Sequence, residues 1–314
     1  MEYIKNTIEF NINEPTVLTL GKFDGLHMGH KYLLEHLFAE KKNGLKVVIF
    51  TFDMPPRRAF DCEETKVLTT NLEKEYIFES CGIDYLVECP FTQEIMTMEA
   101  EDFVEMIVTR LHVKSIVVGN DFRFGHNRGG DYHLLQQLSN KFGYKLEVVK
   151  KMQYHGEDIS STYVRRELES GHLATANKLL GYEFFIEEQV IDGKKLGRTM
   201  NTPTINLMPA KDKLLPPFGV YISKIYMDEK EYGGITNIGK KPTVGDENPV
   251  GIETNIFDFN ENVYGKTVRV SLLYFIREEI KFETMDELEK QIEKDILFGK
   301  DYLKEYKMNK LWHQ

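Results

Sequence analysis

The sequence predicts two domains of different class: a parallel α/β domain, then an antiparallel β-barrel with a C-terminal helix. Its 314 residues exceed the usual length of one domain, about 100 to 200 residues. From residue 16 to about residue 180, β-rich runs alternate with helical patterns, which is typical of a parallel sheet. Short β patterns separated by turns fill residues 185–282, which indicates a barrel. We expect one domain over residues 1–182 and the other over residues 183–314.

The first domain is predicted to contain at least five strands joined by helices. The β-rich runs lie at residues 16–20, 45–52, 83–88, 114–119 and 145–150. A helical face after the first run is formed by Leu33, Leu34, Leu37 and Phe38. Residues 99–111 give a second amphipathic pattern. In such sheets, ligands bind where strand ends meet helix starts.

The second domain is predicted from period-two patterns and a helical tail. The clearest strands are residues 219–227 and 266–275, where apolar residues alternate with their neighbours. The charged tail at residues 284–306 has the pattern of a helix whose charges form a solvated face. The residues expected to dock this helix onto the barrel are Leu288, Ile292 and Leu297.

Composition excludes several classes of partner and cofactor. The chain has 40 basic and 50 acidic residues, a formal charge of −10, so it repels nucleic acid and anionic membranes at long range. Cys62, Cys81 and Cys89 are odd in number and lack CxxC spacing, so we expect reduced thiols rather than disulfides or zinc. The N-terminus lacks a signal-peptide core and no apolar run approaches 18 residues, so we expect a cytoplasmic protein.

The segment GKFDGLHMGH, residues 21–30, follows the first predicted strand and places two histidines at a helix start. Gly21 and Gly25 would let the backbone approach a ligand. His27 and His30, three residues apart, can project from one side of the first turn. A helix start is electropositive, so a cationic histidine is disfavoured there unless an anion compensates it. The pattern predicts a phosphate site. The alternative is that the two histidines only cap the helix or lie on the surface. A metal site is less well supported by this pattern than either.

Three segments of this domain resemble one enzyme family. GKFDGLHMGH is similar to the HxGH signature of nucleotidyltransferases, while VGNDFRFGHNRGGD (118–131) and ISSTYVRREL (159–168) resemble the bifunctional riboflavin kinase/FAD synthetase family of bacteria. The resemblance spans nearly the whole chain with the motifs in the family's order. It implies that the first domain transfers AMP from ATP to FMN and releases pyrophosphate.

The resemblance assigns roles to residues of the first domain. It implies that His27 and His30 stabilise the triphosphate. It places ATP and its phosphates at Gly21, Phe23, Asp24, Gly25, Ser160, Ser161, Thr162 and Arg165. It places the flavin or nucleotide at Asp121, Phe122 and Phe124. Ser161 or Thr162 as a helix cap, and the two phenylalanines as core residues, remain alternatives.

In the second domain, LGRTMNTPTINL (196–207) and GIETNIFDF (251–259) resemble the riboflavin kinase of the same family. The resemblance implies that Gly197, Arg198, Thr204 and Asn206 bind Mg²⁺-ATP. Thr204 and Asn206 would supply oxygen atoms to the metal. Glu253 would be the base for the 5′-hydroxyl of riboflavin, because phosphoryl transfer needs charge neutralisation and one carboxylate at the nucleophile.

The chain departs from the family pattern at three places. Met54 and Pro55 follow TFD where the family has Pro-His-Pro, and Arg57 or Arg58 could take part of the missing role. The other departures are Met200, Asn201 and Thr202 before PTIN, and Lys241 where arginine is usual. Two alternatives therefore stay open: an adenylyltransferase for another phosphorylated acceptor with an inactive barrel, and a flavin-binding module without catalysis. The oligomeric state stays open too.

Overall fold

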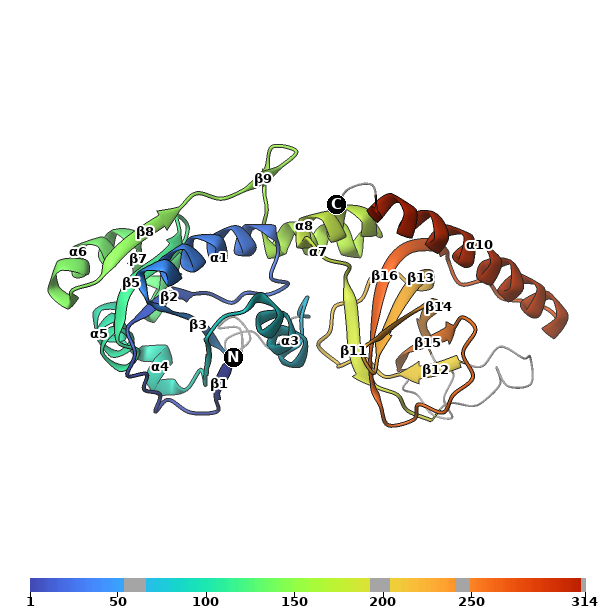
Figure 1. Cartoon of the computed structure of the whole chain (residues 1–314), viewed down its shortest axis with the longest axis horizontal. Helices are drawn as coiled ribbons and strands as arrows, with labels where there is room; N and C mark the ends of the chain where they lie inside the picture. Colours follow the sequence, from blue (N-terminus) through green and yellow to red (C-terminus); the bar gives the residue numbers. More distant parts are fainter. Residues whose placement is uncertain (54–65, 193–203, 241–248, 312–314) are drawn as a thin grey trace. The chain divides into compact units, whose positions relative to one another are not determined.

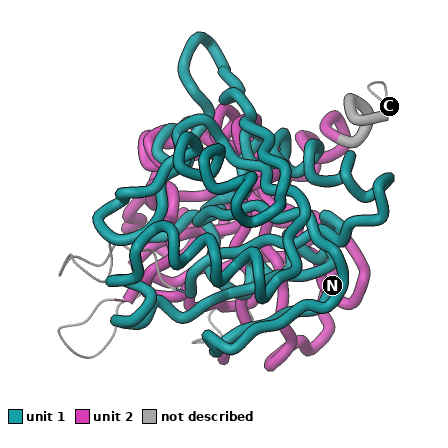
Figure 2. Tube along the Cα trace, turned by 90° about the vertical axis from the view of Figure 1, so that its left-hand side faces the viewer, with its two compact units in different colours: residues 1–163 teal, residues 164–314 magenta. Residues whose placement is uncertain are grey.

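The computed structural model describes residues 1–53, 66–192, 204–240 and 249–311 (Figure 1). The chain forms two compact units, residues 1–163 and residues 164–314, coloured separately in Figure 2. Within the described residues, no helix is both long and apolar enough to span a membrane.

The first unit is built on a six-stranded, fully parallel sheet with the strand order β1-β4-β3-β2-β5-β8. The strands are β1 (Glu2–Lys5), β2 (Thr16–Leu20), β3 (Lys46–Phe52), β4 (Tyr85–Cys89), β5 (Val113–Gly119) and β8 (Lys145–Val149). The five predicted strands are therefore confirmed. The sequence analysis missed β1, a short edge strand in which two residues are half-buried and two are exposed. The Tyr3 hydroxyl helps to hold it by donating to Glu88 Oε2 at 2.5 Å.

Helices cover both faces of this sheet. They are α1 (Met28–Glu40), α3 (Asn71–Cys81), α4 (Gln93–Thr97), α5 (Ala100–Arg110) and α6 (Tyr132–Phe142), with short 3-10 turns at Lys41–Asn43 and His126–Arg128. The apolar face of α5 packs with Leu18 and Leu20 of β2 in one core cluster. Helix α1 buries Leu33, Leu34 and Leu37, as predicted, and lies along β2, β3 and β5 (Figure 1).

The strand order creates a switch point beside β2. From β2 the chain builds outward on one side through β3 and β4, and on the other through β5 and β8. Connections therefore leave the carboxyl ends of β2 and β5 in opposite directions. Open α/β sheets bind ligands in a crevice at such a point, and we call this edge of the sheet the crevice edge. Two small hairpins lie close to the same edge: β6 (Arg123–Phe124) with β7 (Gly130–Asp131), and β9 (Gln153–Tyr154) with β10 (Glu157–Asp158).

The second unit contains a curled antiparallel sheet, a half-barrel, with the strand order β11-β16-β13-β14-β15-β12. Its strands are β11 (Phe185–Gln189), β12 (Thr204–Leu207), β13 (Gly219–Met227), β14 (Lys230–Lys240), β15 (Val250–Ile256) and β16 (Thr267–Arg277). The helices are α7 (Ser161–Glu169), α8 (Leu173–Leu180) and α10 (Met285–Leu311). Helix α7 begins at the end of the first unit. Inside the sheet, the hydroxyls of Ser223, Thr236 and Thr254 form a buried hydrogen-bonded row.

The C-terminal helix docks through a face that contains two of the three predicted residues, Leu288 and Ile292, which are both half-buried. The third, Leu297, is 65% exposed, so its predicted docking role is wrong. The face continues at helical spacing through the buried residues Asp295, Gly299 and Leu303. Asp295 accepts two hydrogen bonds from Arg277, at 2.8 and 3.0 Å, and Gly299 leaves room for Phe257. A search for apolar residues alone cannot find the part of a docking face that an aspartate and a glycine form.

The cysteines in the described part of the chain are free thiols, as predicted. Cys81 is half-buried and Cys89 is fully buried, and burial raises the pKa of the Cys89 thiol to about 12. Cys62 lies outside the described residues. A thiol with so high a pKa stays protonated at neutral pH and is inert.

Helix α8 packs on the half-barrel. Asn177 Nδ2 donates to Leu272 O at 3.0 Å, and its Oδ1 accepts from Phe184 N at 2.8 Å. The side chains of Leu179 and Leu180 are fully buried. A fragment that starts after α8 therefore loses part of the packing of this unit, and the boundary at residues 182–183 stays a prediction.

We expect residues 183–314 to fold as a fragment, but less stably than residues 164–314. Burying two leucines contributes about 3 kcal/mol or more, and the Asn177 bonds add to it. Urea unfolding of both fragments, followed by far-UV circular dichroism, measures the difference. Equal midpoints would mean that α8 contributes nothing to the barrel unit.

Candidate functional sites

The first candidate site begins at the loop between β2 and α1, where the backbone repeatedly adopts left-handed conformations. The φ angles of Phe23, Gly25 and Leu26 are +47°, +81° and +31°. Such conformations cost about 1–3 kcal/mol each at residues other than glycine. Phe23 and Leu26 are each only 1% exposed, so their burial offsets this cost. The Phe23 ring lies against Gly21, Phe78 and His30, and it supports the loop from the core.

Asp24 fastens this loop to two distant segments. Its carboxylate oxygen Oδ1 accepts from Leu68 N at 2.8 Å and from Thr69 N at 3.2 Å. Its backbone carbonyl accepts from Ser161 Oγ at 2.8 Å. Gly25 N donates to Thr69 Oγ1 at 3.0 Å. Asp24, Gly25 and Ser161, which the resemblance assigned to ATP and its phosphates, thus also hold together two of the three motifs that carry the resemblance.

The two histidines stack at the start of α1. His27 is the N-cap, and its Nδ1 accepts from His30 N at 3.4 Å, so the capping alternative describes one of its roles. The two rings are 3.7 Å apart between centroids and inclined by only 16°. Gly29 makes this possible, because a Cβ there would lie 3.2 Å from the His27 ring and 3.3 Å from Ile159 O.

Both histidines are neutral at physiological pH. Burial lowers the pKa of His27 from its ordinary value of 6.5 to about 4, and the positive charge of Lys151 lowers it further. Burial lowers the pKa of His30 well below its ordinary value too, and His27 adds to the effect. Within the described part of the chain, no hydrogen-bond partner is present for the buried Nδ1 of His30. The pair therefore acts as neutral hydrogen-bonding groups rather than as cations.

Asp121, Phe122 and Phe124 follow β5 at the same edge of the sheet. The Asp121 carboxylate is largely exposed and pairs with Lys151 Nζ at 2.8 Å. Phe124 is 8% exposed and belongs to the core, while Phe122 stacks on it with a centroid distance of 5.4 Å. The core alternative describes Phe124, and Asp121 is the member of this group that reaches the crevice edge.

The ISST segment divides its roles between neighbouring residues. Ser160 Oγ accepts from Tyr163 N at 3.2 Å, so Ser160, rather than Ser161 or Thr162, caps α7. The Thr162 side chain is exposed. Arg165 belongs to the second compact unit and is half-buried there.

Two residues of this site were missed by sequence reasoning, Gly29 and Lys151. Gly29 stands between the two histidines, and only the distance to the His27 ring shows why it is needed. Lys151 follows β8, and its position after the last strand of the sheet was the available signal, because parallel strands end at one edge.

Several expected residues lie outside the described part of the chain. They are Gly197 and Arg198 of the expected kinase nucleotide site, together with Met54, Pro55, Arg57, Arg58, Met200, Asn201, Thr202 and Lys241.

The second candidate site lies on one face of the half-barrel. Asn206 of β12 is paired with Glu253 of β15, and Asn237 of β14 is paired with Glu253 from the other side. Directly paired residues share a face of a sheet, so these three side chains point to one side. Thr204, two residues before Asn206, points to the same side. Asn206 is 5% exposed, whereas Glu253 is exposed to solvent.

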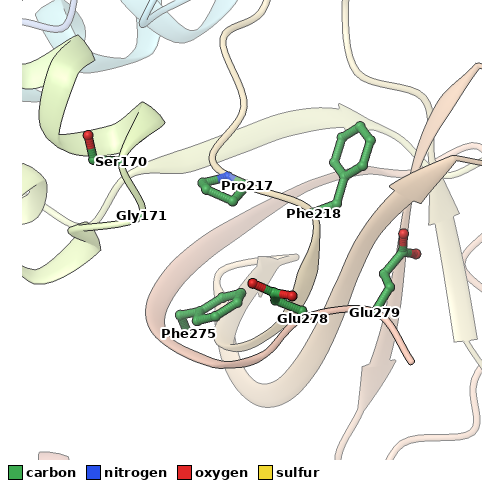
Figure 3. Close-up of a pocket in the computed structure, with 7 residues that line it drawn as sticks. All are labelled: Ser170, Gly171, Pro217, Phe218, Phe275, Glu278 and Glu279. Carbon is green, nitrogen blue, oxygen red and sulfur yellow. The ribbon is translucent and has the colours of Figure 1, made fainter. Parts of the chain in front are cut away.

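A pocket of about 410 Å³ lies in the second unit (Figure 3). Its lining residues are Ser170, Gly171, Pro217, Phe218, Phe275, Glu278 and Glu279. Glu279 Oε1 accepts from Asn237 Nδ2 at 3.3 Å, and Asn237 pairs directly with Glu253. Asn237 therefore links Glu279 in the wall of the pocket to Glu253, the expected base. Two aromatic rings, Phe218 and Phe275, also line this pocket.

A second pocket of about 240 Å³ begins at Thr204. Phe259 and Tyr264 give it an aromatic lining, and Asn260, Glu261 and Asn262 give it polar groups. The polar face of the sheet thus lies near both pockets. Among the described residues, no group of three His, Cys, Asp or Glu side chains is arranged to hold a metal ion.

A helix start at the switch point of a parallel α/β sheet is where enzymes of this fold class bind phosphate groups. The FAD synthetase family model matches residues 9–163, and the riboflavin kinase model matches residues 180–303. The chain belongs to the bifunctional riboflavin kinase/FMN adenylyltransferase family, and it has both activities.

Curated relatives agree on this family, and a solved structure shares the fold. Bifunctional riboflavin kinase/FMN adenylyltransferases are 36% identical over 92% of this chain in Escherichia coli K12, covering 93% of that relative, and over 89% in Bacillus subtilis, covering 90%. The Haemophilus influenzae relative is also 36% identical, over 91% of this chain and 93% of its own length. A crystal structure described as a macrolide-efflux protein from Streptococcus pneumoniae has a TM-score of 0.85 and 30% identity, covering 95% of this chain and 98% of its own.

The low pKa of His27 makes stability depend on pH. Between about pH 6.5 and pH 4, His27 is protonated in the unfolded chain but stays neutral in the folded chain. The free energy of unfolding therefore falls as the pH falls. The loss reaches up to about 2 kcal/mol at pH 5. We expect His27→Asn, which keeps an N-cap acceptor, to lose less stability between pH 7 and pH 5 than the parent chain. Urea unfolding at both pH values measures this, and an unchanged difference would contradict the neutral, buried state of His27.

Proposed function

We propose that the first unit transfers AMP from ATP to FMN over the loop between β2 and α1. The observation that carries this proposal is the hydrogen bond from Ser161 Oγ to Asp24 O, which joins two segments 137 residues apart. It brings together the start of α1 and the start of α7. Unpaired N–H groups at helix starts bind phosphate, so two such starts at one place suit a triphosphate.

In this reaction, an oxygen of the FMN phosphate attacks the α-phosphorus of ATP. The bond between that phosphorus and the oxygen leading to the β-phosphate breaks, and pyrophosphate leaves with the electron pair. Negative charge grows on the α-phosphate oxygens meanwhile. Neutral His27 and His30 each carry one N–H that can donate to such an oxygen, and donors fixed in advance by capping and stacking need no rearrangement.

We expect His27→Asn combined with His30→Gln to suppress FAD formation from FMN by about 10² to 10³-fold or more, because each donor contributes to charge stabilisation. The matched control is His36→Gln, also on α1, where His36 pairs with Glu147 at 2.5 Å. Urea unfolding of the same proteins reports whether the first unit is folded, and riboflavin phosphorylation reports whether the second unit is intact. Near-normal FAD synthesis by the double variant would contradict the catalytic role and leave the two histidines only their structural role at the start of α1.

The second unit, in our proposal, phosphorylates riboflavin on the face that carries Glu253. Riboflavin would occupy the pocket between Phe218 and Phe275, because aromatic side chains favour a flat flavin ring. Asn237, held by Glu279, would stand between this pocket and Glu253. The Glu253 carboxylate would then accept the proton of the 5′-hydroxyl as that oxygen attacks the γ-phosphorus of ATP.

We further propose that Mg²⁺ is required for both reactions. In the kinase, the Thr204 hydroxyl and the Asn206 amide oxygen are hard oxygen donors two residues apart on one face of β12, which suits Mg²⁺ together with ATP phosphates. When bound, the ion neutralises phosphate charge. Burial of Asn206 at 5% exposure fixes its amide, and the pocket beginning at Thr204 gives room for the nucleotide.

Replacing Glu253 by Gln removes a base but keeps the size of the side chain. We expect riboflavin phosphorylation to fall by about 10² to 10⁴-fold, the usual contribution of a positioned base. FAD synthesis from supplied FMN should remain near the parent level. The control is Glu229→Gln, at the exposed turn between β13 and β14. Normal phosphorylation by E253Q would remove Glu253 from this role, and loss of both activities in a folded protein would contradict the assignment to two sites.

One assay tests the whole proposal. The purified chain is incubated with riboflavin, ATP and Mg²⁺, and FMN and FAD are separated by chromatography. We expect both products, and none when Mg²⁺ is chelated. FAD made only from supplied FMN would favour an inactive barrel, and flavin binding without turnover would favour a non-catalytic module. We also propose small-molecule partners only, and a cytoplasmic location, which fit the formal charge of −10.

A further inference from the structure

The adenylyltransferase site needs a positive charge that its histidines do not provide. ATP brings several negative charges to the start of α1, and pyrophosphate leaves with most of them. His27 and His30 are neutral, so they donate hydrogen bonds without compensating charge. Asp121, at the same edge, is itself negative. A cationic side chain at this edge would supply what is missing.

Lys151 lies at this position. The strands β2, β5 and β8 are neighbours in the sheet, and their carboxyl ends lead to His27, Asp121 and Lys151 in that order. Asn120 N donates to Val149 O at 3.1 Å, which ties the segment after β5 to the end of β8. Lys151 therefore stands at the crevice edge, two strands from the histidine loop.

A hairpin connects Lys151 to the second phosphate-binding segment. Ile159 N donates to Met152 O at 2.9 Å, which closes the base of the β9–β10 hairpin. Lys151 precedes this base, and Ser160, the cap of α7, follows it. Ile159 O also lies next to Gly29 of α1. The lysine, the start of α7 and the start of α1 thus converge.

The present partners of Lys151 are exchangeable. Its Nζ lies 2.8 Å from Asp121 Oδ2 and 3.7 Å from Asp158 Oδ2. The side chains are 32% exposed for Lys151, 63% for Asp121 and 46% for Asp158. Ion pairs this exposed contribute little to stability, so the ammonium can exchange a carboxylate for a phosphate oxygen at little cost. The Asp121 hydrogen bond raises the pKa of Lys151, which keeps it cationic.

We propose that Lys151 binds the triphosphate of ATP in the first unit and stabilises the leaving pyrophosphate. This role rests on the adenylyltransferase function proposed for that unit. Asp121 and Asp158 hold the ammonium at the crevice edge until the nucleotide arrives. Lys151 is then a further substrate-binding residue of the reaction, beyond those that the motifs indicate.

The test compares Lys151→Met with Lys150→Met in the full chain. Lys150 is the preceding residue, is exposed, and carries the same charge. For K151M we expect kcat/KM for ATP in FAD synthesis to fall by about 10- to 100-fold, the effect of losing a hydrogen bond to a charged group. Inhibition by inorganic pyrophosphate should weaken in parallel. K150M should match the parent, Lys151→Arg should recover most of the activity, and riboflavin phosphorylation should be unchanged in all three.

Equal losses in K151M and K150M, or unchanged ATP and pyrophosphate dependence in K151M, would overturn the proposal. So would a loss in K151M that appears only in kcat, with unaltered pyrophosphate inhibition, because that would mean a structural role.

A second measurement uses the unaltered chain and needs neither folding of a variant nor turnover. Lysines are acetylated with an amine-reactive reagent, and the modified positions are counted by mass spectrometry. Inorganic pyrophosphate should slow the modification of Lys151 but leave Lys150 unaffected. Equal protection of the two, or none, would contradict the proposal. Protection of Lys151 in a chain that makes no FAD would instead place the failure in the proposed reaction.

Discussion

The hydrogen bonds of Asp24 are the interactions on which the first site depends. The carboxylate accepts two backbone N–H groups from the segment before α3, and the carbonyl accepts the Ser161 hydroxyl. The residues around Asp24 adopt left-handed backbone, which an isolated peptide would leave. Because Asp24 ties the loop to two other segments, the histidines can be stacked and capped before any substrate binds. Preorganisation of this kind is what a site needs in order to stabilise charge.

Sequence reasoning predicted the parts of the fold that follow from local patterns. The four inner strands of the first sheet, β4, β3, β2 and β5, have strong apolar runs, and the buried face of α1 is regular. The short strand β1 escaped because its pattern is brief and half-exposed, and a long-range bond from Tyr3 to Glu88 holds it in place. Part of the docking face of α10 escaped because it is formed by Asp295, whose partner Arg277 lies on another element.

The site shows the same division. The motifs identified the histidines, the ISST segment and Glu253 as site residues. They did not show which residue of each motif makes which contact. Ser160 caps a helix, whereas Ser161 reaches the loop of α1, and no local pattern distinguishes these neighbours. The neutrality of His27 follows from its burial, which cannot be deduced from the sequence motif. The position of Lys151 near the site depends on the strand order, because β8 becomes a neighbour of β5 only in the folded sheet.

The N-cap bond of His27 also bears on where its proton lies. The N–H of His30 donates to His27 O at 2.8 Å and at 3.4 Å to His27 Nδ1, which favours the neutral tautomer with its proton on Nε2. This tautomer presents a donor outward from the helix and keeps the lone pair inward. A metal ion would need the reverse arrangement, with a free lone pair facing it. The capping bond thus selects against metal ions and in favour of oxyanions, and it does so without any charge on the imidazole.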